Sequence, residues 1–211
     1  MWRDTLIRLF PALRSLGHGC YVVGGAVRDL HLHREPGDVD VACRDPLAVA
    51  QSIGGELITV VRRRHVYYRV NLAERSYDFA EFVGGDIEHD LEWRDFTIDA
   101  MAVDLSGDVL LDPFEGRRDL ETRLLRMVKE SNYDVMPLHF LRGVRLAVKY
   151  DFAFEPATLD AIRRRASLIR HADPELVTKE LGLIFSYGRR RKALDVLHAT
   201  GLDQPLGLTH P

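Results

Sequence analysis

Short hydrophobic runs, separated by Gly, Pro and Asp, fill the first half of the chain. Between residues 19 and about 111 these runs are rich in β-branched and aromatic residues, which indicates strands. They are YVVGG, DVDVAC, ELITVV, VYYRVNL, SYDFAEF and DVLLD. Helical patterns interrupt them at the N-terminus, at residues 27–33, in PLAVAQSI and near RDLETRLLRMV. The first half is therefore predicted to be a mixed α/β unit built on a small sheet.

After about Asn132 the hydrophobic pattern indicates helices only. In PLHFLRGVRLAVKYDF, the side chains of Leu141, Val144 and Val148 fall on one helical face, with basic residues on another. Three later segments repeat the pattern, with Pro at the start or Gly near the end: PATLDAIRRRASLIRH, PELVTKELGLIFSYG and RRKALDVLHATGL. We place the boundary near residues 132–137, which predicts an α/β domain at 1–134 and an all-α domain at 135–211.

Charge is divided between the two halves. The whole chain of 211 residues has a net charge of −3, but residues 1–135 carry 17 Lys and Arg against 24 Asp and Glu. Residues 136–192 carry 12 against 6. This split suggests an acidic, metal-using first half and a polyanion-binding second half, or simply a helical surface crossed by salt bridges.

Composition excludes several classes of protein. The hydrophobic content of 46% suits an ordinary globular chain, and no apolar run approaches the roughly 20 residues that span a bilayer. We therefore expect a cytoplasmic protein without a membrane partner. Cys20 and Cys43 are too few for a disulfide framework or a zinc site, so we interpret them as core residues in a reducing compartment.

Two acidic residues alternate with valine in the segment GDVDVAC. On a strand, Asp38 and Asp40 would point to the same face, which brings two like charges within a few ångströms. Carboxylates arranged in this way suit Mg²⁺, which prefers one or two carboxylates together with substrate phosphates. Asp78, on a second predicted strand, could act as a general base on an attacking hydroxyl. The alternative is a polar strand rim without a metal.

A double glycine precedes this pair. Gly24 and Gly25 end the run YVV and open a helical segment that contains Arg28 and Asp29. Glycines let backbone N–H groups approach a phosphate closely, and the N-terminus of a helix favours negative charge. Followed 13 residues later by the two aspartates, the double glycine predicts a site for a metal-bound phosphate.

Several segments together resemble the head and neck of class II tRNA nucleotidyltransferases and bacterial poly(A) polymerases. In order, they are YVVGGAVRDLHL, DVDVA, DLEWRDFTIDAMAVD, LLDPFEGRRDLETRLLRMV and PLHFLRGVRLAVKYDFAFEPATL. The resemblance extends from about residue 19 to residue 202. It implies an α+β nucleotidyltransferase head of polymerase-β type, followed by an all-α neck.

The same resemblance implies roles for particular residues. Incoming NTP would be held by the double-glycine motif, by the segment RDFTIDAMA and by the neck, and two Mg²⁺ ions would be held by the aspartate pair. The implied metal ligands are Asp38 and Asp40. With Asp78, which the strand pattern alone suggests and which could instead be a solvent-facing strand residue, they form the expected catalytic set. The expected nucleotide-binding residues are Gly24, Gly25, Arg28, Asp29, Arg94, Asp95, Asp99, Met136, His139, Arg142 and Arg145.

This chain also departs from the family pattern. Trp93 and Asp99 stand where the family usually has Arg and Asn in the segment that seats the ribose. Met136 and His139 stand where the family has the Asp and Arg that read the incoming base. Three residues apart, they should share one face at the start of the first neck helix. Met has no useful donor and neutral His has at most one, so this pair cannot copy the family template. We therefore expect one preferred nucleotide or a relaxed choice, and not ordered addition of C, C and A.

The leading hypothesis is a metal-dependent enzyme that transfers NMP from NTP, such as ATP, to an RNA 3′-hydroxyl. The resemblance favours tRNA as acceptor, as in CCA-adding enzymes or poly(A) polymerases. Arg189, Arg190 and Arg191 continue the basic neck and are candidate RNA contacts. Two alternatives stay open: a catalytically weakened nucleotide- or RNA-binding module, and a transferase that acts on a non-RNA acceptor. A separate subunit or an oligomer could supply the tRNA-gripping domains that the family has beyond the neck.

Overall fold

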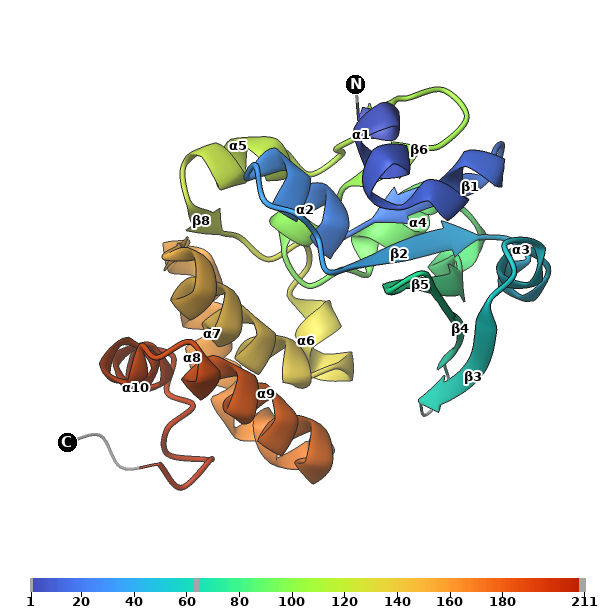
Figure 1. Ribbon diagram of the computed structural model, residues 1–211. Coiled ribbons are helices and arrows are strands. Elements are labelled where there is room, and N and C mark those ends of the chain that lie inside the picture. Colours follow the sequence, from blue (N-terminus) through green and yellow to red (C-terminus); the bar gives the residue numbers. More distant parts are fainter. Residues whose placement is uncertain (1, 63–64, 209–211) are drawn as a thin grey trace. The chain divides into compact units, whose positions relative to one another are not determined.

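A computed structural model describes residues 2–62 and 65–208 (Figure 1). The chain forms two compact units, each with its own core. The first comprises Met1–Arg94 and Ile98–Leu120, and the second comprises Asp95–Thr97 and Glu121–Pro211. Residues 121–134 thus lie with the second unit. The domain boundary near residues 132–137 stays a prediction.

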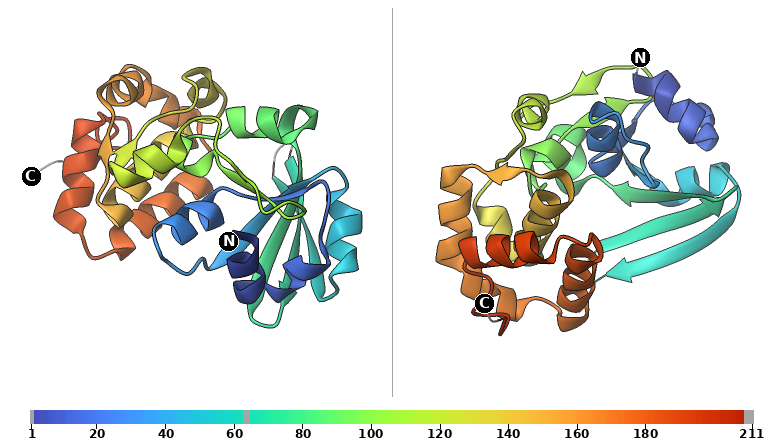
Figure 2. Two further views of the ribbon diagram at one scale, coloured as in Figure 1. Left: turned by 90° about the horizontal axis from the view of Figure 1, so that it is seen from above. Right: turned by 60° about the vertical axis from the view of Figure 1, so that its left-hand side comes forward.

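A seven-stranded sheet forms the centre of the first unit. Its strand order is β3-β4-β5-β2-β1-β6-β7; β2 and β5 are parallel, and the other neighbouring pairs are antiparallel. The strands are β1 (Cys20–Val23), β2 (Asp38–Cys43), β3 (Glu56–Arg62), β4 (His65–Leu72), β5 (Arg75–Glu81), β6 (Ala102–Asp104) and β7 (Leu110–Leu111). The right-hand view of Figure 2 shows β3 and β4 as a long hairpin at one edge of this sheet. The predicted strands are confirmed, but the three-residue strand β6 was not expected.

Short helices connect and cover these strands. They are α1 (Trp2–Leu9), α2 (Gly25–His31), α3 (Pro46–Ser52), α4 (Ile87–Glu92) and α5 (Gly116–Glu121), with 3₁₀ turns η1 (Pro11–Ser15), η2 (Val83–Gly85) and η3 (Thr97–Asp99). Helix α3 begins where the Asp45 carboxylate accepts a hydrogen bond from the Ala48 N–H at 3.1 Å. The Asp86 carboxylate caps α4 in the same way, which satisfies an N–H group that a helix start leaves without an intrahelical partner. Helix α4 was not predicted.

The two faces of the sheet differ in polarity. Val39 and Val41 on β2 and Tyr77 and Phe79 on β5 are almost completely buried on one face. The Phe10 ring packs edge-on against the Tyr77 ring there, with a centroid distance of 5.8 Å. Because successive side chains of a strand point to opposite faces, Asp38, Asp40 and Asp78 are placed on the other face.

The second unit is mainly helical. Its helices are α6 (Ser131–Val135), α7 (Leu138–Tyr150), α8 (Pro156–Arg165), α9 (Pro174–Ser186) and α10 (Arg190–Ala199), with the 3₁₀ segment η4 (Ala166–His171). The four predicted neck helices are confirmed. The expectation of helices only was wrong, because β8 (Leu124–Leu125) and β9 (Ala153–Phe154) form a two-stranded parallel sheet. The helix expected near RDLETRLLRMV ends at Glu121, and Arg123 has a left-handed backbone with φ of 55°.

An aromatic cluster forms part of the core of the second unit. The Tyr133 ring stacks on Phe140 at a centroid distance of 5.2 Å and meets Phe96 edge-on at 6.0 Å. Phe96 also lies against Phe154 and against Gly143 of α7. Residues 95–97 therefore pack with α7, although they are distant from it in sequence.

Neither cysteine is in a disulfide. Cys20 and Cys43 are buried free thiols that face each other across β1 and β2, as expected for core residues. In the part of the chain that the structure describes, no helix combines the length and the apolar character needed to cross a membrane.

Candidate active site

Three carboxylates lie on the polar face of the sheet in the first unit. Asp38 and Asp40 are both exposed and are separated by the buried Val39. On the neighbouring parallel strand β5, Asp78 is the register partner of Asp40. Residues in register on adjacent strands present their side chains to the same face, so the sheet brings the predicted catalytic carboxylates together.

The aspartate pair fits a Mg²⁺ ion that is shared with a nucleotide. Mg²⁺ keeps several waters and typically takes one or two carboxylates plus substrate phosphates, not a cage of protein ligands. Two exposed carboxylates on one strand provide that donor set. Among residues 2–62 and 65–208, no group of three or more His, Cys, Asp or Glu side chains forms an all-protein metal site.

Sequence reasoning missed an arginine beside these carboxylates. Arg69 of β4 is in register with Asp78, and its Nε and Nη2 donate to the two carboxylate oxygens of Asp78 at 2.7 and 2.6 Å. The only sequence signal is the alternation of VYYRVNL, which places Arg69 and Asn71 on the same face of the strand. Asp78 lies opposite Arg69 only because the β4–β5 turn sets the register of the two strands.

The double glycine forms the turn between β1 and α2. Gly24 has φ of 67° and ψ of −127°, a conformation that essentially only glycine adopts without strain. A Cβ at Gly24 would lie 3.4 Å from Nη1 of Arg94. Arg94 is held there by Asp90, whose Oδ2 accepts from Nη2 at 2.6 Å. The first unit thus places a cation next to the glycine turn, and Asp90 is a second residue that the sequence analysis did not identify.

Arg28 faces the interior of the first unit. Only 7% of the residue is exposed, and its Nε and Nη1 pair with Asp29 at 2.9 Å and with Asp99 at 2.5 Å. A Cβ at Gly25 would lie 3.3 Å from the Arg28 guanidinium. In this arrangement Arg28 supports the glycine turn from inside, and Asp99 helps to balance its buried charge. Direct nucleotide contacts by Arg28, Asp29 and Asp99 stay a prediction.

The other predicted nucleotide-binding residues belong to the second unit. Asp95 is 2% exposed, and its Oδ2 lies 3.0 Å from Nε of Arg142. Arg145 donates from Nε to Oε2 of Glu180, on α9, at 2.7 Å. These two arginines of α7 thus have acidic partners within their own unit. Their predicted nucleotide contacts are untested.

One expectation about the base-reading positions was wrong. We expected Met136 and His139 to share a face at the start of the neck helix. Helix α7 begins only at Leu138, and Met136, with φ of −133° and ψ of 77°, lies in the link between α6 and α7. Pro137 sits between the two elements, which explains the break because proline disfavours helical conformation in the residue before it. The His139 ring packs edge-on against Tyr133 at 5.9 Å.

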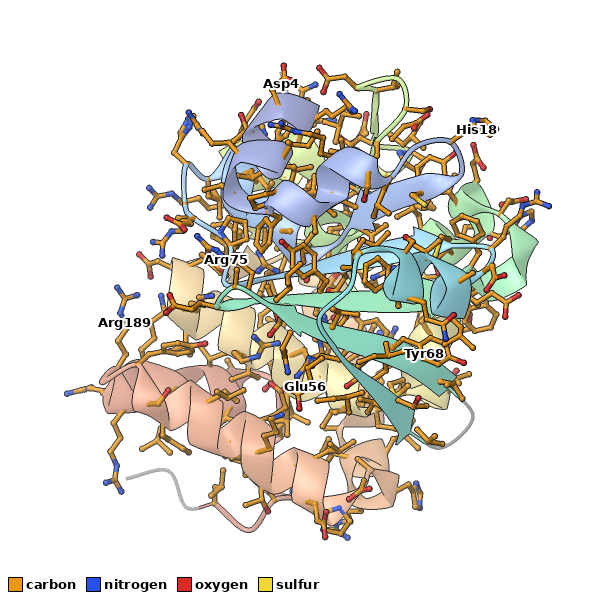
Figure 3. The ribbon with its side chains drawn as sticks, turned by 45° about the vertical axis from the view of Figure 1, so that its right-hand side comes forward. Asp4, His18, Glu56, Tyr68, Arg75 and Arg189 are labelled. Atoms are coloured by element: carbon orange, nitrogen blue, oxygen red, sulfur yellow. The ribbon has the colours of Figure 1, made fainter. Side chains whose placement is uncertain are left out.

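The three arginines at the start of α10 differ in their surroundings. Arg189, labelled in Figure 3, donates from Nη1 to the Val148 carbonyl near the end of α7 at 3.0 Å. Arg190 and Arg191 are exposed in the first turn of α10. Cations at a helix N-terminus are unfavourable because they oppose the helix dipole. Bound phosphate groups would reduce this repulsion.

Two known domain families match segments of the chain. "Poly A polymerase head domain" matches residues 20–83 and 55–126, and "Probable RNA and SrmB-binding site of polymerase A" matches residues 151–207. The CC-adding tRNA nucleotidyltransferase of Halalkalibacterium halodurans is 36% identical over 203 residues, which cover 93% of this chain and 52% of that protein.

Solved structures resemble the chain over the same extent. The CCA-adding enzyme of Bacillus stearothermophilus in complex with CTP has a TM-score of 0.80 and 32% identity, over 95% of this chain and 53% of that chain. The Thermotoga maritima CCA-adding enzyme complexed with tRNA has a TM-score of 0.84 and 26% identity, over 94% and 52%. The chain spans about half the length of these relatives. Since the head-domain matches together cover residues 20–126, half of the sequence, the chain belongs to the poly A polymerase head domain family.

Proposed function

We propose that the chain is the nucleotidyltransferase head and neck of an enzyme that transfers NMP from NTP to the 3′-hydroxyl of a tRNA. The observation that carries the proposal is the row of carboxylates on one sheet face, with Asp78 in register with Asp40 and Asp38 two residues away on the same strand. The glycine turn with its neighbouring Arg94 provides the accompanying phosphate-binding features.

The carboxylates and the arginine would divide the work of phosphoryl transfer. Asp38 and Asp40 would hold two Mg²⁺ ions, which when bound lower the pKa of the attacking hydroxyl and stabilise the pyrophosphate that leaves. Arg94 would neutralise the triphosphate that lies against the turn at Gly24. Asp78 would orient the attacking hydroxyl or accept its proton. Little covalent chemistry falls to the protein, so positioning and charge account for most of the acceleration.

The choice of tRNA as acceptor has separate support. A relative at 36% identity is named a CC-adding tRNA nucleotidyltransferase, and a structural neighbour is a CCA-adding enzyme complexed with tRNA. The basic composition of residues 136–192 agrees with a polyanionic partner. The exposed Arg190 and Arg191 are the most accessible candidates for contacts to its phosphates.

The test is NMP transfer by the purified chain to tRNA 3′ ends, with each labelled NTP and Mg²⁺. Asp40→Asn should reduce the rate by about 10³ or more, which corresponds to roughly 4 kcal/mol of transition-state stabilisation. Asp4→Asn is the matched control, because Asp4 is an exposed aspartate of the same unit, on α1 (Figure 3). It should keep wild-type activity. Both variants should melt within a few degrees of the wild type.

Two results would contradict the proposal. Activity of Asp40→Asn within tenfold of the wild type would show that the carboxylate does not hold a catalytic metal. Labelling of a small molecule or a protein, with none of RNA, would show that the acceptor class is wrong.

A further inference from the structure

The Arg69–Asp78 pair has a geometry that leaves little freedom to either side chain. Both Asp78 oxygens accept from the guanidinium, at 2.7 and 2.6 Å, so the two planar groups meet fork to fork. The side chain of Asp78 is 13% exposed and that of Arg69 is 37% exposed. The pair spans β4 and β5 directly, because the two residues are register partners.

The same arginine lies two strands away from the proposed metal ligands, with Asp78 between them. Arg69, Asp78 and Asp40 follow one another in register across β4, β5 and β2. The hydrogen bond to Asp78 raises the pKa of Arg69, and the negative charge of Asp38 raises it further. Three carboxylates on one sheet face repel one another unless a cation lies among them.

We propose that Arg69 is a positioning residue of the active site, with two separable contributions. Its fork-shaped guanidinium holds the Asp78 carboxylate in one orientation beside Asp40, and its charge stabilises the carboxylate face before Mg²⁺ binds. The inference rests on the proposed function, since it concerns the same site.

The two contributions predict different effects of two substitutions. Lysine keeps the positive charge but cannot form the bidentate contact, because an ammonium group is a point donor. Glutamine loses both the charge and the fork. Arg69→Lys should therefore affect only the orientation of Asp78, whereas Arg69→Gln should affect orientation and charge together.

Arg75 provides a matched control on the same sheet. It begins β5, at the turn that joins β4 to β5 (Figure 3), and its Nη2 pairs with Glu35 at 2.5 Å. Its guanidinium lies over the Phe10 ring, which packs against the buried apolar face of the sheet. Arg75→Gln removes one cation and one ion pair without touching Asp78.

The first measurement is Mn²⁺ binding to the metal-free chain without nucleotide. Arg69→Gln should bind Mn²⁺ about fivefold more tightly than the wild type, because one positive charge near a divalent ion is gone. Arg69→Lys and Arg75→Gln should stay within twofold of the wild type. In metal-free buffer, the melting temperature of Arg69→Gln should fall. The double variant Arg69→Gln with Asp78→Asn should recover part of this loss, because residues 69 and 78 are in contact and their substitutions are not additive.

The second measurement is the steady-state rate of NMP transfer. Arg69→Lys and Arg69→Gln should both lower kcat by about tenfold, which is less than the roughly 10²–10⁴-fold of a positioned proton-transfer group because Asp78 itself is still present. The KM for NTP should change less than kcat. Arg75→Gln should keep wild-type kcat and KM. A purely structural cross-strand pair would lower stability in both Arg69 variants and leave Mn²⁺ affinity and kcat unchanged.

The outcomes separate this inference from the proposed function. If Asp40→Asn abolishes Mn²⁺ binding while Arg69→Gln binds Mn²⁺ like the wild type, Arg69 has no electrostatic role and the proposed function stands. Wild-type kcat in Arg69→Lys would refute the orienting role. Failure of the wild-type chain to bind Mn²⁺ even when NTP is present would refute the inference and the proposed function together.

Discussion

Replacing Gly143 by alanine tests the close packing of α7 against the segment that contains Asp95. A Cβ at Gly143 would lie 2.6 Å from Cζ of Phe96 and 3.0 Å from Cε1 of Phe154. Carbon atoms in ordinary contact are about 3.5 to 4 Å apart. Phe96 would therefore have to move by about 1 Å inside a fully buried cluster, in which it is 0% exposed.

Two opposing contributions determine how Gly143→Ala changes the free energy of unfolding. Overpacking a core typically costs about 1–3 kcal/mol, while replacing a helical glycine by alanine contributes about 1 kcal/mol of stability. We expect Gly143→Ala to lower the free energy of unfolding of the second unit by about 1 kcal/mol. For a unit of this size, that is a decrease of roughly 4–8 °C in Tm.

Gly182→Ala measures the stabilisation from replacing a helical glycine by alanine, without the overpacking. Gly182 lies within α9, and a Cβ there would meet nothing within 4 Å. This control should therefore raise stability by up to about 1 kcal/mol, so that the two alanine variants differ by roughly 2 kcal/mol. Urea unfolding of both variants measures the difference.

The same substitution should also affect activity, because the ring that must move directly follows Asp95. A shift of Phe96 disturbs the Asp95–Arg142 pair, so the KM for NTP should rise in Gly143→Ala and not in Gly182→Ala. Equal stability of the two alanine variants would refute the packing argument.

Burial raises the pKa of Tyr133, and the charge of Asp95 adds to this. The free energy of unfolding of the second unit should therefore keep its full value below pH 10 and fall as the pH rises above 10 toward the folded-state pKa. In urea unfolding, Tyr133→Phe should lower this free energy by about 1 kcal/mol at pH 8, but its decline at alkaline pH should be smaller. Replacing Arg190 and Arg191 by glutamine should reduce the slope of log affinity for tRNA against log salt concentration by about 0.7 to 0.9 for each phosphate-binding arginine that is replaced. An unchanged slope would show that the two arginines are solvated and bind no phosphate. Measured kcat/KM for the four NTPs should show one preferred nucleotide or little preference, and Met136→Asp with His139→Arg should sharpen the choice; programmed addition of C, C and A by the wild type would show that other residues read the base.

Local periodicity accounts for most of what could be predicted. Alternation in GDVDVAC places Asp38 and Asp40 on one face wherever that strand lies, because the period of a strand is two residues. The helices α7 to α10 are equally local: their apolar spacing and the residues at their ends define them without reference to the rest of the fold. Strand β6 and helix α4 were missed because both are too short to show a period.

Contacts between residues distant in sequence depended on the tertiary structure. Arg69 and Asp78 meet because the β4–β5 turn sets the register, and a shift by one residue would have sent one of them to the opposite face. Arg28 reaches Asp99 across 71 residues, and Asp95 meets Arg142 because residues 95–97 pack with α7. The sequence determined which side chains have the chemistry of the site, since residue type and local period are readable along the chain. Which of them bind each other depended on strand register and packing, because the free energies that select those pairs come from the folded core.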